Sequence, residues 1–189
     1  MRSVIESPVP SAAQARVIAA AQKLFARHGV GGTSLQMIAD ELGVTKAAVY
    51  HQYRTRDEIV LAAARAELDI LAAVVATAEE EPSPQRARDA LIDGIVDLTV
   101  DRRRTVSTIL GDPVIAGFFD DDEQFREVMH QMRRLLVGED ASAEARVRLA
   151  MLLAAISGAA THPFVRDLDD DTLREQLSEL ARRFLGLRG

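Results

Sequence analysis

Apolar residues recur at intervals of three and four along most of this chain, which is the periodicity of amphipathic α-helices. No stretch shows the alternation of Val, Ile, Thr and Tyr that indicates a β-sheet. The first apolar stripe follows a capping box formed by Ser11 and Gln14 and ends at Gly29. It contains Val17, Ile18, Ala21, Leu24 and Phe25. The pattern therefore predicts an all-α protein with its first helix between Ser11 and Gly29.

Two short helices are expected next. Thr33 and Gln36 form a second capping box, and the helix that they open ends at Leu42, before Gly43. Thr45 can cap another helix that reaches about residue 52. Two short helices that meet at a tight glycine turn are typical of the helix-turn-helix, whose second helix enters the major groove of DNA.

The residue types around this second short helix suit contacts with DNA. Short and donor-bearing side chains at its start let the backbone approach base edges, and the phenolic, imidazole, amide and guanidinium groups that follow can reach phosphates. Helix N-termini capped by threonine add backbone amides for the same purpose. The candidate DNA-binding residues are Thr33, Thr45, Lys46, Ala47, Ala48, Tyr50, His51, Gln52 and Arg56.

The net charge of −6 argues against a polyanionic partner for the chain as a whole, but the charge is distributed unevenly along it. Residues 1–56 contain seven basic and three acidic residues, whereas residues 57–189 contain 16 basic and 26 acidic residues. The N-terminal part thus carries a charge of +4 and the remainder −10. Only the N-terminal part is expected to approach DNA.

A long fourth helix is expected from Arg56 to about Glu80, opened by a capping box of Thr55 and Glu58. It is apolar on most of its circumference, so we expect it to be buried on several sides and to link the helix-turn-helix to the rest of the chain. Further helices are expected at 85–103, 104–118, 120–137, 142–161 and 170–186, with breaks at Pro113 and at two polar or proline-containing stretches.

Eleven positions within about residues 12–60 keep a recognisable spacing: Thr33, Ile38, Ala39, Gly43, Val44, Thr45, Tyr50, Tyr53, Arg56, Asp57 and Ile59. They resemble the DNA-binding signature of the TetR family. Ala47 stands where that family commonly has glycine, and Gln52 where it commonly has histidine. Tyr53, Ile38, Ala39 and Val44 are expected in the core of the small domain.

The resemblance implies a flexible arm at 1–10, a helix-turn-helix domain at 11–56 and a larger helical effector-binding and dimerisation domain at 57–189. It also implies a homodimer joined by the last two helices, where small residues on one helix and large apolar residues on the other permit close packing. Burial of these residues within one protomer is the alternative. The expected interface residues are Ala150, Ala154, Gly158, Leu173, Leu177, Leu180 and Phe184.

The leading hypothesis is a repressor that binds a pseudo-palindromic operator and is released from it by a small, hydrophobic effector. The expected pocket residues are Leu68, Leu71, Ile92, Ile95, Val96, Thr99, Leu110, Phe118, Phe125 and Met129, most of which could equally be core. A helical small-molecule carrier or scaffolding module without operator binding is the alternative, and salt-dependent DNA binding would distinguish the two.

Four carboxylates, Asp89, Asp93, Asp97 and Asp101, recur at every fourth position of one expected helix. Like charges at this spacing repel, so something should compensate them. One interpretation is a solvated face with arginines such as Arg65, Arg88 or Arg102 nearby. The other is a partly buried carboxylate that selects a cationic or hydrogen-bonding effector.

Nothing in the sequence indicates an enzyme, a metal site or a cofactor. The chain has no cysteine, and His28, His51, His130 and His162 are dispersed without a partner four residues away. The longest apolar run, residues 149–160, is too short to cross a bilayer, and no signal peptide is evident. We therefore expect a cytoplasmic protein without a membrane partner.

Overall fold

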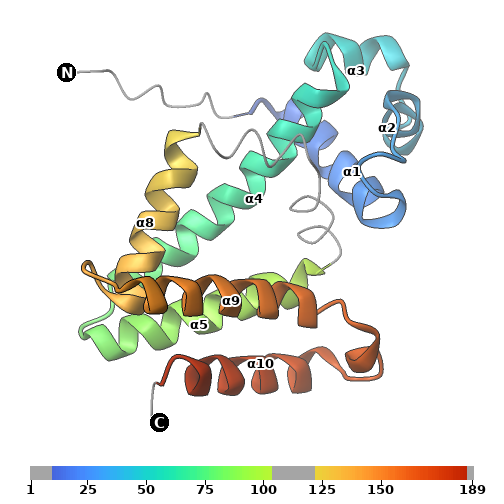
Figure 1. Cartoon of the computed structure of the whole chain (residues 1–189). Helices are drawn as coiled ribbons and strands as arrows, with labels where there is room; N and C mark the ends of the chain where they lie inside the picture. The colour runs from blue at the N-terminus through green and yellow to red at the C-terminus, as the bar shows by residue number, and fades with distance from the viewer. Residues whose placement is uncertain (1–9, 104–121, 187–189) are drawn as a thin grey trace, which may run out of the picture. The chain divides into compact units, whose positions relative to one another are not determined.

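The computed structural model describes residues 10–103 and 122–186, and within these ranges the chain forms helices and no strands (Figure 1). The predicted all-α fold is confirmed. The expected helix at 104–118 lies outside the described residues. The helices are α1 (Ala12–His28), α2 (Leu35–Leu42), α3 (Lys46–Gln52), α4 (Arg56–Glu79), α5 (Pro84–Asp101), α8 (Glu123–Val137), α9 (Ala143–Ala159) and α10 (Asp170–Phe184), with a 3₁₀ turn, η1 (Pro163–Val165).

The chain divides into two compact units between Ala63 and Ala64. The division lies inside α4, which runs from Arg56 to Glu79, whereas we expected a second domain to begin at residue 57. The first two turns of α4 count with unit 1, where Ile59 and Val60 are buried. One continuous helix therefore contributes to both units.

Unit 1 is built on α1, α2 and α3, each of which packs against the other two. Phe25, Ile38 and Val49, one from each helix, are fully buried at its centre. The predicted capping box of Ser11 and Gln14 opens α1. Gly43 ends α2 with a φ of 65°, a left-handed conformation that glycine adopts without a steric penalty, so the chain turns at once into α3.

Two details of this unit differ from our predictions. The cap of α2 is Ser34, whose side chain accepts a hydrogen bond from the backbone N–H of Met37, and not Thr33. Thr33 is buried, and its hydroxyl donates to the carbonyl oxygen of Gly29 at 2.9 Å, so it closes the preceding turn instead. Val44, expected in the core, is 38% exposed because it follows the turn at Gly43 and faces outward. Tyr53, Ile38 and Ala39 are buried as predicted.

In unit 2, α5 packs against α8, α9 and α10, and Figure 1 shows α5, α9 and α10 running side by side. Leu91, Ile92 and Leu173 are fully buried there. Gly94 of α5 lies so close to Val74 of α4 that a Cβ atom at this position would overlap the Cγ1 atom of the valine. Absence of a side chain at Gly94 thus permits the close packing of α4 on α5.

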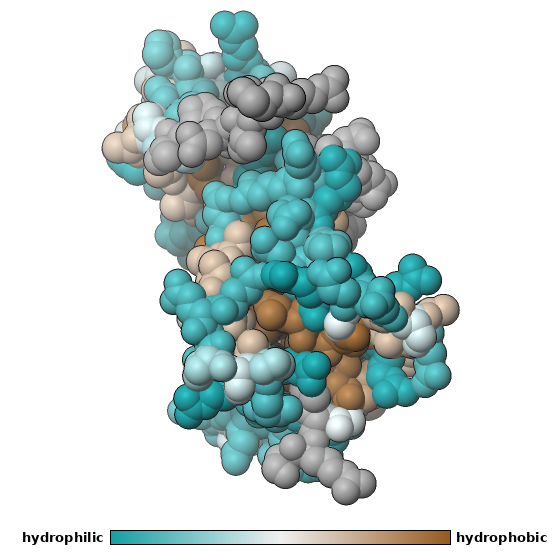
Figure 2. Space-filling model, turned by 90° about the vertical axis from the view of Figure 1, so that its left-hand side faces the viewer, coloured by the Kyte–Doolittle hydropathy of each residue, from teal (hydrophilic) through white to brown (hydrophobic). Residues whose placement is uncertain are grey.

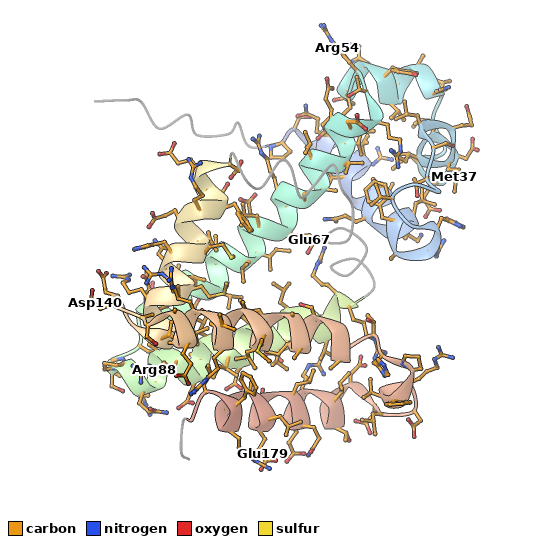
Figure 3. The ribbon with its side chains drawn as sticks, viewed as in Figure 1. Met37, Arg54, Glu67, Arg88, Asp140 and Glu179 are labelled. Carbon is orange, nitrogen blue, oxygen red and sulfur yellow. The ribbon has the colours of Figure 1, made fainter. Side chains whose placement is uncertain are left out.

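Polar contacts tie the second part of α4 to α5 and α8. Glu67 of α4, which is labelled in Figure 3, is 9% exposed and accepts two hydrogen bonds of 2.6 and 2.5 Å from Arg102. This carboxylate raises the pKa of the Arg102 guanidinium, chiefly through the side-chain hydrogen bond. Further contacts pair Arg65 with Asp122, Asp69 with Gln124, and Glu79 with Arg134. Within residues 10–103 and 122–186, no helix is both long and apolar enough to cross a membrane.

Candidate DNA-binding surface

The local sequence holds α3 on unit 1 by one side and leaves its other sides exposed. The Thr45 hydroxyl accepts a hydrogen bond from the backbone N–H of Ala48 at 3.2 Å, which caps the helix as predicted. Val49 anchors the helix in the core with 1% of its surface exposed. The exposed residues of this segment are Thr45, Lys46, Ala47, Ala48, Tyr50 and His51, all of them in the predicted DNA-binding set.

The polar side chains of α3 contact one another. The Lys46 ammonium lies 5.7 Å from the centre of the Tyr50 ring, within the range of a cation–π interaction. Tyr50 remains 43% exposed. The side-chain amide of Gln52, which is half-buried, lies 3.3 Å from Nδ1 of His51. The helix therefore presents a cation, a phenol, an imidazole and an amide from two consecutive turns.

Thr33 and Arg56, also in the predicted set, have other roles in the structure. Arg56 donates from Nε to the carbonyl oxygen of Thr33 at 3.0 Å and from a second nitrogen to the carbonyl oxygen of Val30. Both residues thus stabilise the loop between α1 and α2, and the Thr33 side chain is buried rather than turned to solvent. The sequence could not reveal this, because the bonded atoms are backbone carbonyls with no side-chain signature.

Two further residues flank α3 on the outside of unit 1. Arg54, between α3 and α4, is exposed and projects outward (Figure 3). Val44 lies beside the N-terminus of α3 and offers an apolar group that could contact a thymine methyl.

Thr55 accepts a hydrogen bond from the backbone N–H of Glu58 at 3.1 Å, whereas the Glu58 carboxylate accepts from the N–H of Arg54 and not from that of Thr55. The predicted capping box at α4 is therefore present only in part.

The two acidic side chains of α2 contact neighbouring basic or amide side chains. Glu41 pairs with Lys23 and lies 4.0 Å from Arg27. The hydrogen bond from Lys23 holds the pKa of this carboxyl below its usual value. Gln36 donates to Asp40 at 2.8 Å. These contacts engage both acidic residues of unit 1 on α2, which lowers their repulsion toward a polyanion near α3.

The residues expected to line an effector pocket lie in unit 2 but are mostly packed. Leu68, Ile92, Ile95, Val96 and Thr99 are buried, and Leu71, Phe125 and Met129 are half-buried. Leu110 and Phe118, together with the neighbouring Val106 and Phe119, lie outside the described residues. The described residues therefore include only some of the expected pocket residues, and these do not enclose a complete pocket.

The expected dimer residues separate into two groups. Ala150, Ala154, Gly158, Leu180 and Phe184 are exposed on α9 and α10. Leu173 and Leu177 are buried within unit 2, on the helix that packs against α5, so for these two residues the alternative of burial within one protomer holds. Sequence reasoning missed Val147 and Met151, each 58% exposed and apolar.

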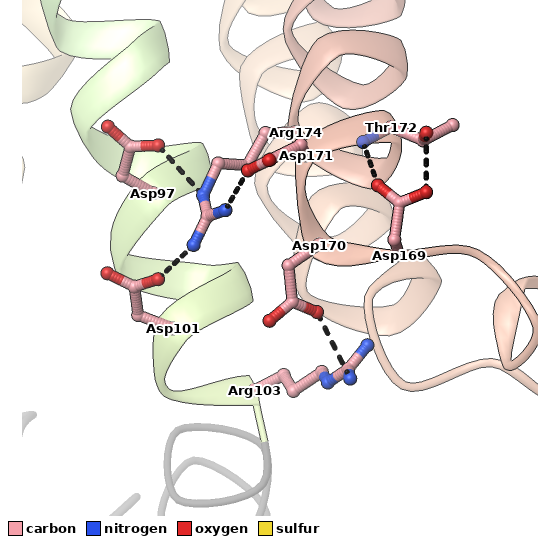
Figure 4. A network of polar contacts seen from close by, with 8 residues as sticks. All are labelled: Asp97, Asp101, Arg103, Asp169, Asp170, Asp171, Thr172 and Arg174. Atoms are coloured by element: carbon pink, nitrogen blue, oxygen red, sulfur yellow. Dashed lines mark hydrogen bonds and ion pairs between the residues drawn. The ribbon is translucent and has the colours of Figure 1, made fainter.

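Arginines of α10 compensate the four aspartates of α5. Arg182 lies 3.1 Å from Asp89 and 2.6 Å from Asp93, and Arg174 lies 3.3 Å from Asp97 and also pairs with Asp101 (Figure 4). The arginines expected nearby make other contacts as well: Arg102 is hydrogen-bonded to Glu67 and interacts more weakly with the charge of Asp101, Arg65 pairs with Asp122, and Arg88 donates to the carbonyl oxygen of Leu135. The eight-residue spacing of the two arginines matches the spacing of the two aspartate pairs.

The described residues thus define a helix-turn-helix protein with an exposed recognition helix and an all-helical second unit. Residues 17–63 match the profile of the bacterial regulatory proteins of the tetR family. No curated protein is significantly similar in sequence. The match and the fold confirm the resemblance of this N-terminal segment to the TetR family of bacterial regulatory proteins.

Solved structures share this fold over most of their length. A TetR-like transcriptional regulator from Rhodococcus sp. RHA1 has a TM-score of 0.70 at 19% identity, with 95% of this chain and 100% of that chain covered. The ketosteroid transcriptional regulator KstR2 of Mycobacterium tuberculosis has a TM-score of 0.65 at 17% identity, covering 94% and 95%. A TetR/AcrR-family regulator from Thermobifida fusca has a TM-score of 0.61 at 25% identity, covering 93% and 98%.

Proposed function

We propose that this protein is a homodimeric repressor that binds a pseudo-palindromic DNA operator through α3 and leaves it when unit 2 binds a small, hydrophobic effector. The observation that carries the proposal is the exposed face of α3, on which Lys46, Tyr50 and His51 project from a helix anchored by Val49. A short helix of this kind can lie in the major groove while its basic and hydroxyl groups contact phosphates and base edges.

The charge distribution supports the same partner. Residues 1–56 carry +4 against −10 for the remainder, so unit 1 is the part that a polyanion attracts. Asp40 and Glu41 of α2 are engaged by neighbouring side chains. Lys46 stays exposed at the start of α3.

The exposed apolar residues of α9 and α10 support a dimer. Val147, Met151, Leu180 and Phe184 are between 44% and 58% exposed, and α9 adds small residues at Ala150, Ala154 and Gly158. A two-fold pair of such helices would bury these groups and hold two recognition helices at a fixed spacing. A fixed spacing is what a pseudo-palindrome requires.

The effector would act through α4. This helix begins at Arg56, four residues after α3 ends, and passes from unit 1 into unit 2 without a break. In unit 2 it is bonded to α5 through Glu67 and to α8 through Asp69. The proposal assumes a second conformation in which α4 is displaced from its position in the DNA-binding form. An effector that binds this second conformation more tightly would reduce the population of the DNA-binding form.

Capture of genomic fragments by the purified protein tests operator binding. We expect a small set of enriched fragments whose affinity falls steeply with salt. Ala48→Glu is the matched variant, because it places a negative charge on the exposed side of α3 without touching the core. A carrier or scaffolding module would enrich no fragment, and the variant would then behave as the parent does.

A reporter downstream of an enriched fragment tests the direction of regulation. Expression should fall when the parent protein is present and should not fall with Ala48→Glu. Increased expression would show an activator instead. Apolar compounds that restore expression should also lower the affinity of the purified protein for the fragment. A compound that restores expression without lowering this affinity does not act as an effector of the protein.

A further inference from the structure

Exposed apolar groups occur on and beside α3, in addition to the hydrophobic side chains that Figure 2 shows on one face of unit 2. Val44 is 38% exposed, and its backbone N–H donates to the carbonyl oxygen of Ala39 at 3.0 Å, which fixes its position after the turn at Gly43. Ala47 and Ala48, in the first turn of α3, are exposed as well. The exposed side chains of these residues can neither donate nor accept a hydrogen bond, so they take no part in the polar contacts of α3.

Ala47 and His51 are the residues of α3 that point most directly away from the core of unit 1. Successive residues of an α-helix are rotated by about 100°, so Ala47 lies about 200° round the helix axis from Val49, whose side chain is buried. His51 points about 40° from Ala47, one turn later. Lys46 and Tyr50, which contact each other, lie on one flank of this direction. A DNA groove that receives α3 would therefore meet the methyl group of Ala47 and the imidazole of His51 at its floor.

The place of Ala47 in the first turn of α3 determines which part of the DNA it would meet. In helix-turn-helix proteins, residues at the N-terminus of the recognition helix contact base edges in the major groove. Each base pair presents hydrogen-bonding groups there, and among the four bases only thymine presents a methyl group, at C5. A side chain that consists of one methyl group can pack against this C5-methyl group and cannot form a hydrogen bond with any base. The chemistry of Ala47 therefore favours thymine.

We propose that the Ala47 methyl group packs against the C5-methyl group of a thymine in each half-site of the operator, so that this base pair is recognised by apolar contact. The inference rests on the operator binding of the proposed function and adds a chemical group that each half-site must carry. Lys46 and Tyr50 would contribute affinity, because they can reach phosphates, whereas Ala47 contributes sequence preference.

Replacement of thymine by uracil tests this inference, because uracil lacks only the C5-methyl group and pairs with adenine in the same way. Each thymine of an enriched fragment is replaced in turn, and fluorescence anisotropy gives the affinity of the purified full chain. Loss of one buried methyl contact should weaken binding of the parent about fourfold at one position of a half-site. Replacement in both half-sites should weaken binding about fifteenfold, since separate base pairs contribute almost additively.

Ala47→Gly removes the proposed contact and introduces the residue that the TetR family commonly has at this position. The ratio of the affinities for the thymine and uracil fragments should then fall to about one. Any loss of helix stability affects both fragments alike, so this ratio isolates the methyl contact. Ala48→Gly is the matched variant, because it removes the same group about 100° round the helix, and its affinity ratio should stay at the parental value.

The possible outcomes separate this inference from the proposed function. If a fragment is enriched but no uracil weakens its binding to the parent, operator binding stands and the role of Ala47 is wrong. A uracil effect that persists in Ala47→Gly, or that disappears only in Ala48→Gly, would also overturn the inference, because another residue would then contact the methyl group. If no fragment is enriched, the proposed function and the inference both fail.

Discussion

The Nε atom of Arg56 donates a hydrogen bond to the carbonyl oxygen of Thr33 at 3.0 Å, which ties the first residue of α4 to the residue before the cap of α2. The same guanidinium donates to the carbonyl oxygen of Val30. One side chain thus fixes the loop between α1 and α2 against the start of α4. Within unit 1, this bond joins the helix-turn-helix to the helix that continues into unit 2.

Arg56→Ala should lower the free energy of unfolding of unit 1 by about 1–3 kcal/mol, because two partly buried carbonyl oxygens lose their donor. Arg56→Lys should recover little of this free energy of unfolding, since an ammonium lacks the planar guanidinium geometry that reaches both oxygens. Urea unfolding followed by circular dichroism would measure the effect. Arg54→Ala, a truncation of the exposed neighbouring arginine, should leave stability within about 0.5 kcal/mol of the parent.

Lys46→Ala should weaken binding to an enriched DNA fragment and lower the slope of log affinity against log salt by about one unit, because one phosphate contact is lost. Tyr50→Phe should weaken binding with a smaller change of slope. Fluorescence anisotropy at several salt concentrations would report both values. Arg126→Ala removes an exposed positive charge from unit 2 and should change neither. Parental affinity in both α3 variants would remove these residues from the DNA-binding surface.

Gly94→Ala should destabilise unit 2 by about 1–3 kcal/mol, because the new methyl group would overlap Cγ1 of Val74. Val74→Ala frees that space, so the double variant should lose less stability than the sum of the two single variants. Thermal unfolding of all four proteins completes the cycle. Strict additivity would show that α4 and α5 do not meet at this point.

The stability of unit 2 should depend on pH through Asp169, the cap of α10. Its carboxylate accepts hydrogen bonds from the backbone N–H and the hydroxyl of Thr172, and these hold the pKa of Asp169 below its ordinary value. A pKa that is lower in the folded than in the unfolded state stabilises the fold at neutral pH, and this contribution is lost as pH falls through the folded pKa.

Asp169→Ala should therefore lower the unfolding midpoint at pH 7, and the difference from the parent should shrink in acid, at about pH 3 or below. Glu175→Gln, an exposed change on the same helix, is the control for general loss of negative charge. An equal difference at both pH values would mean that the cap does not depend on the ionised carboxylate.

Local signals predicted most of the fold. The capping box of Ser11 and Gln14 and the left-handed Gly43 mark real helix ends, because both act within a few residues of chain. The cap of α2 was assigned one residue early, since Thr33 and Ser34 are both good caps and only tertiary packing buries the threonine. Periodicity alone could not show that Leu173 and Leu177 face α5, because a buried stripe and a dimer stripe have the same spacing.

The candidate site shows the same limit. The exposed residues of α3 followed from the motif, whereas the role of Arg56 depended on carbonyl oxygens that any sequence could supply. The partners of the α5 aspartates lie more than seventy residues away on α10, so no local pattern could select Arg174 and Arg182 over other arginines.

The central claim is that two copies of α3 bind one DNA site together, and footprinting on an enriched fragment tests it most directly. The account predicts two protected segments with inverted sequence symmetry, their centres one helical turn of DNA apart, about 34–36 Å. Both should disappear with Ala48→Glu while the protein stays folded by circular dichroism. A single asymmetric protected segment, or protection that survives Ala48→Glu, would contradict the claim.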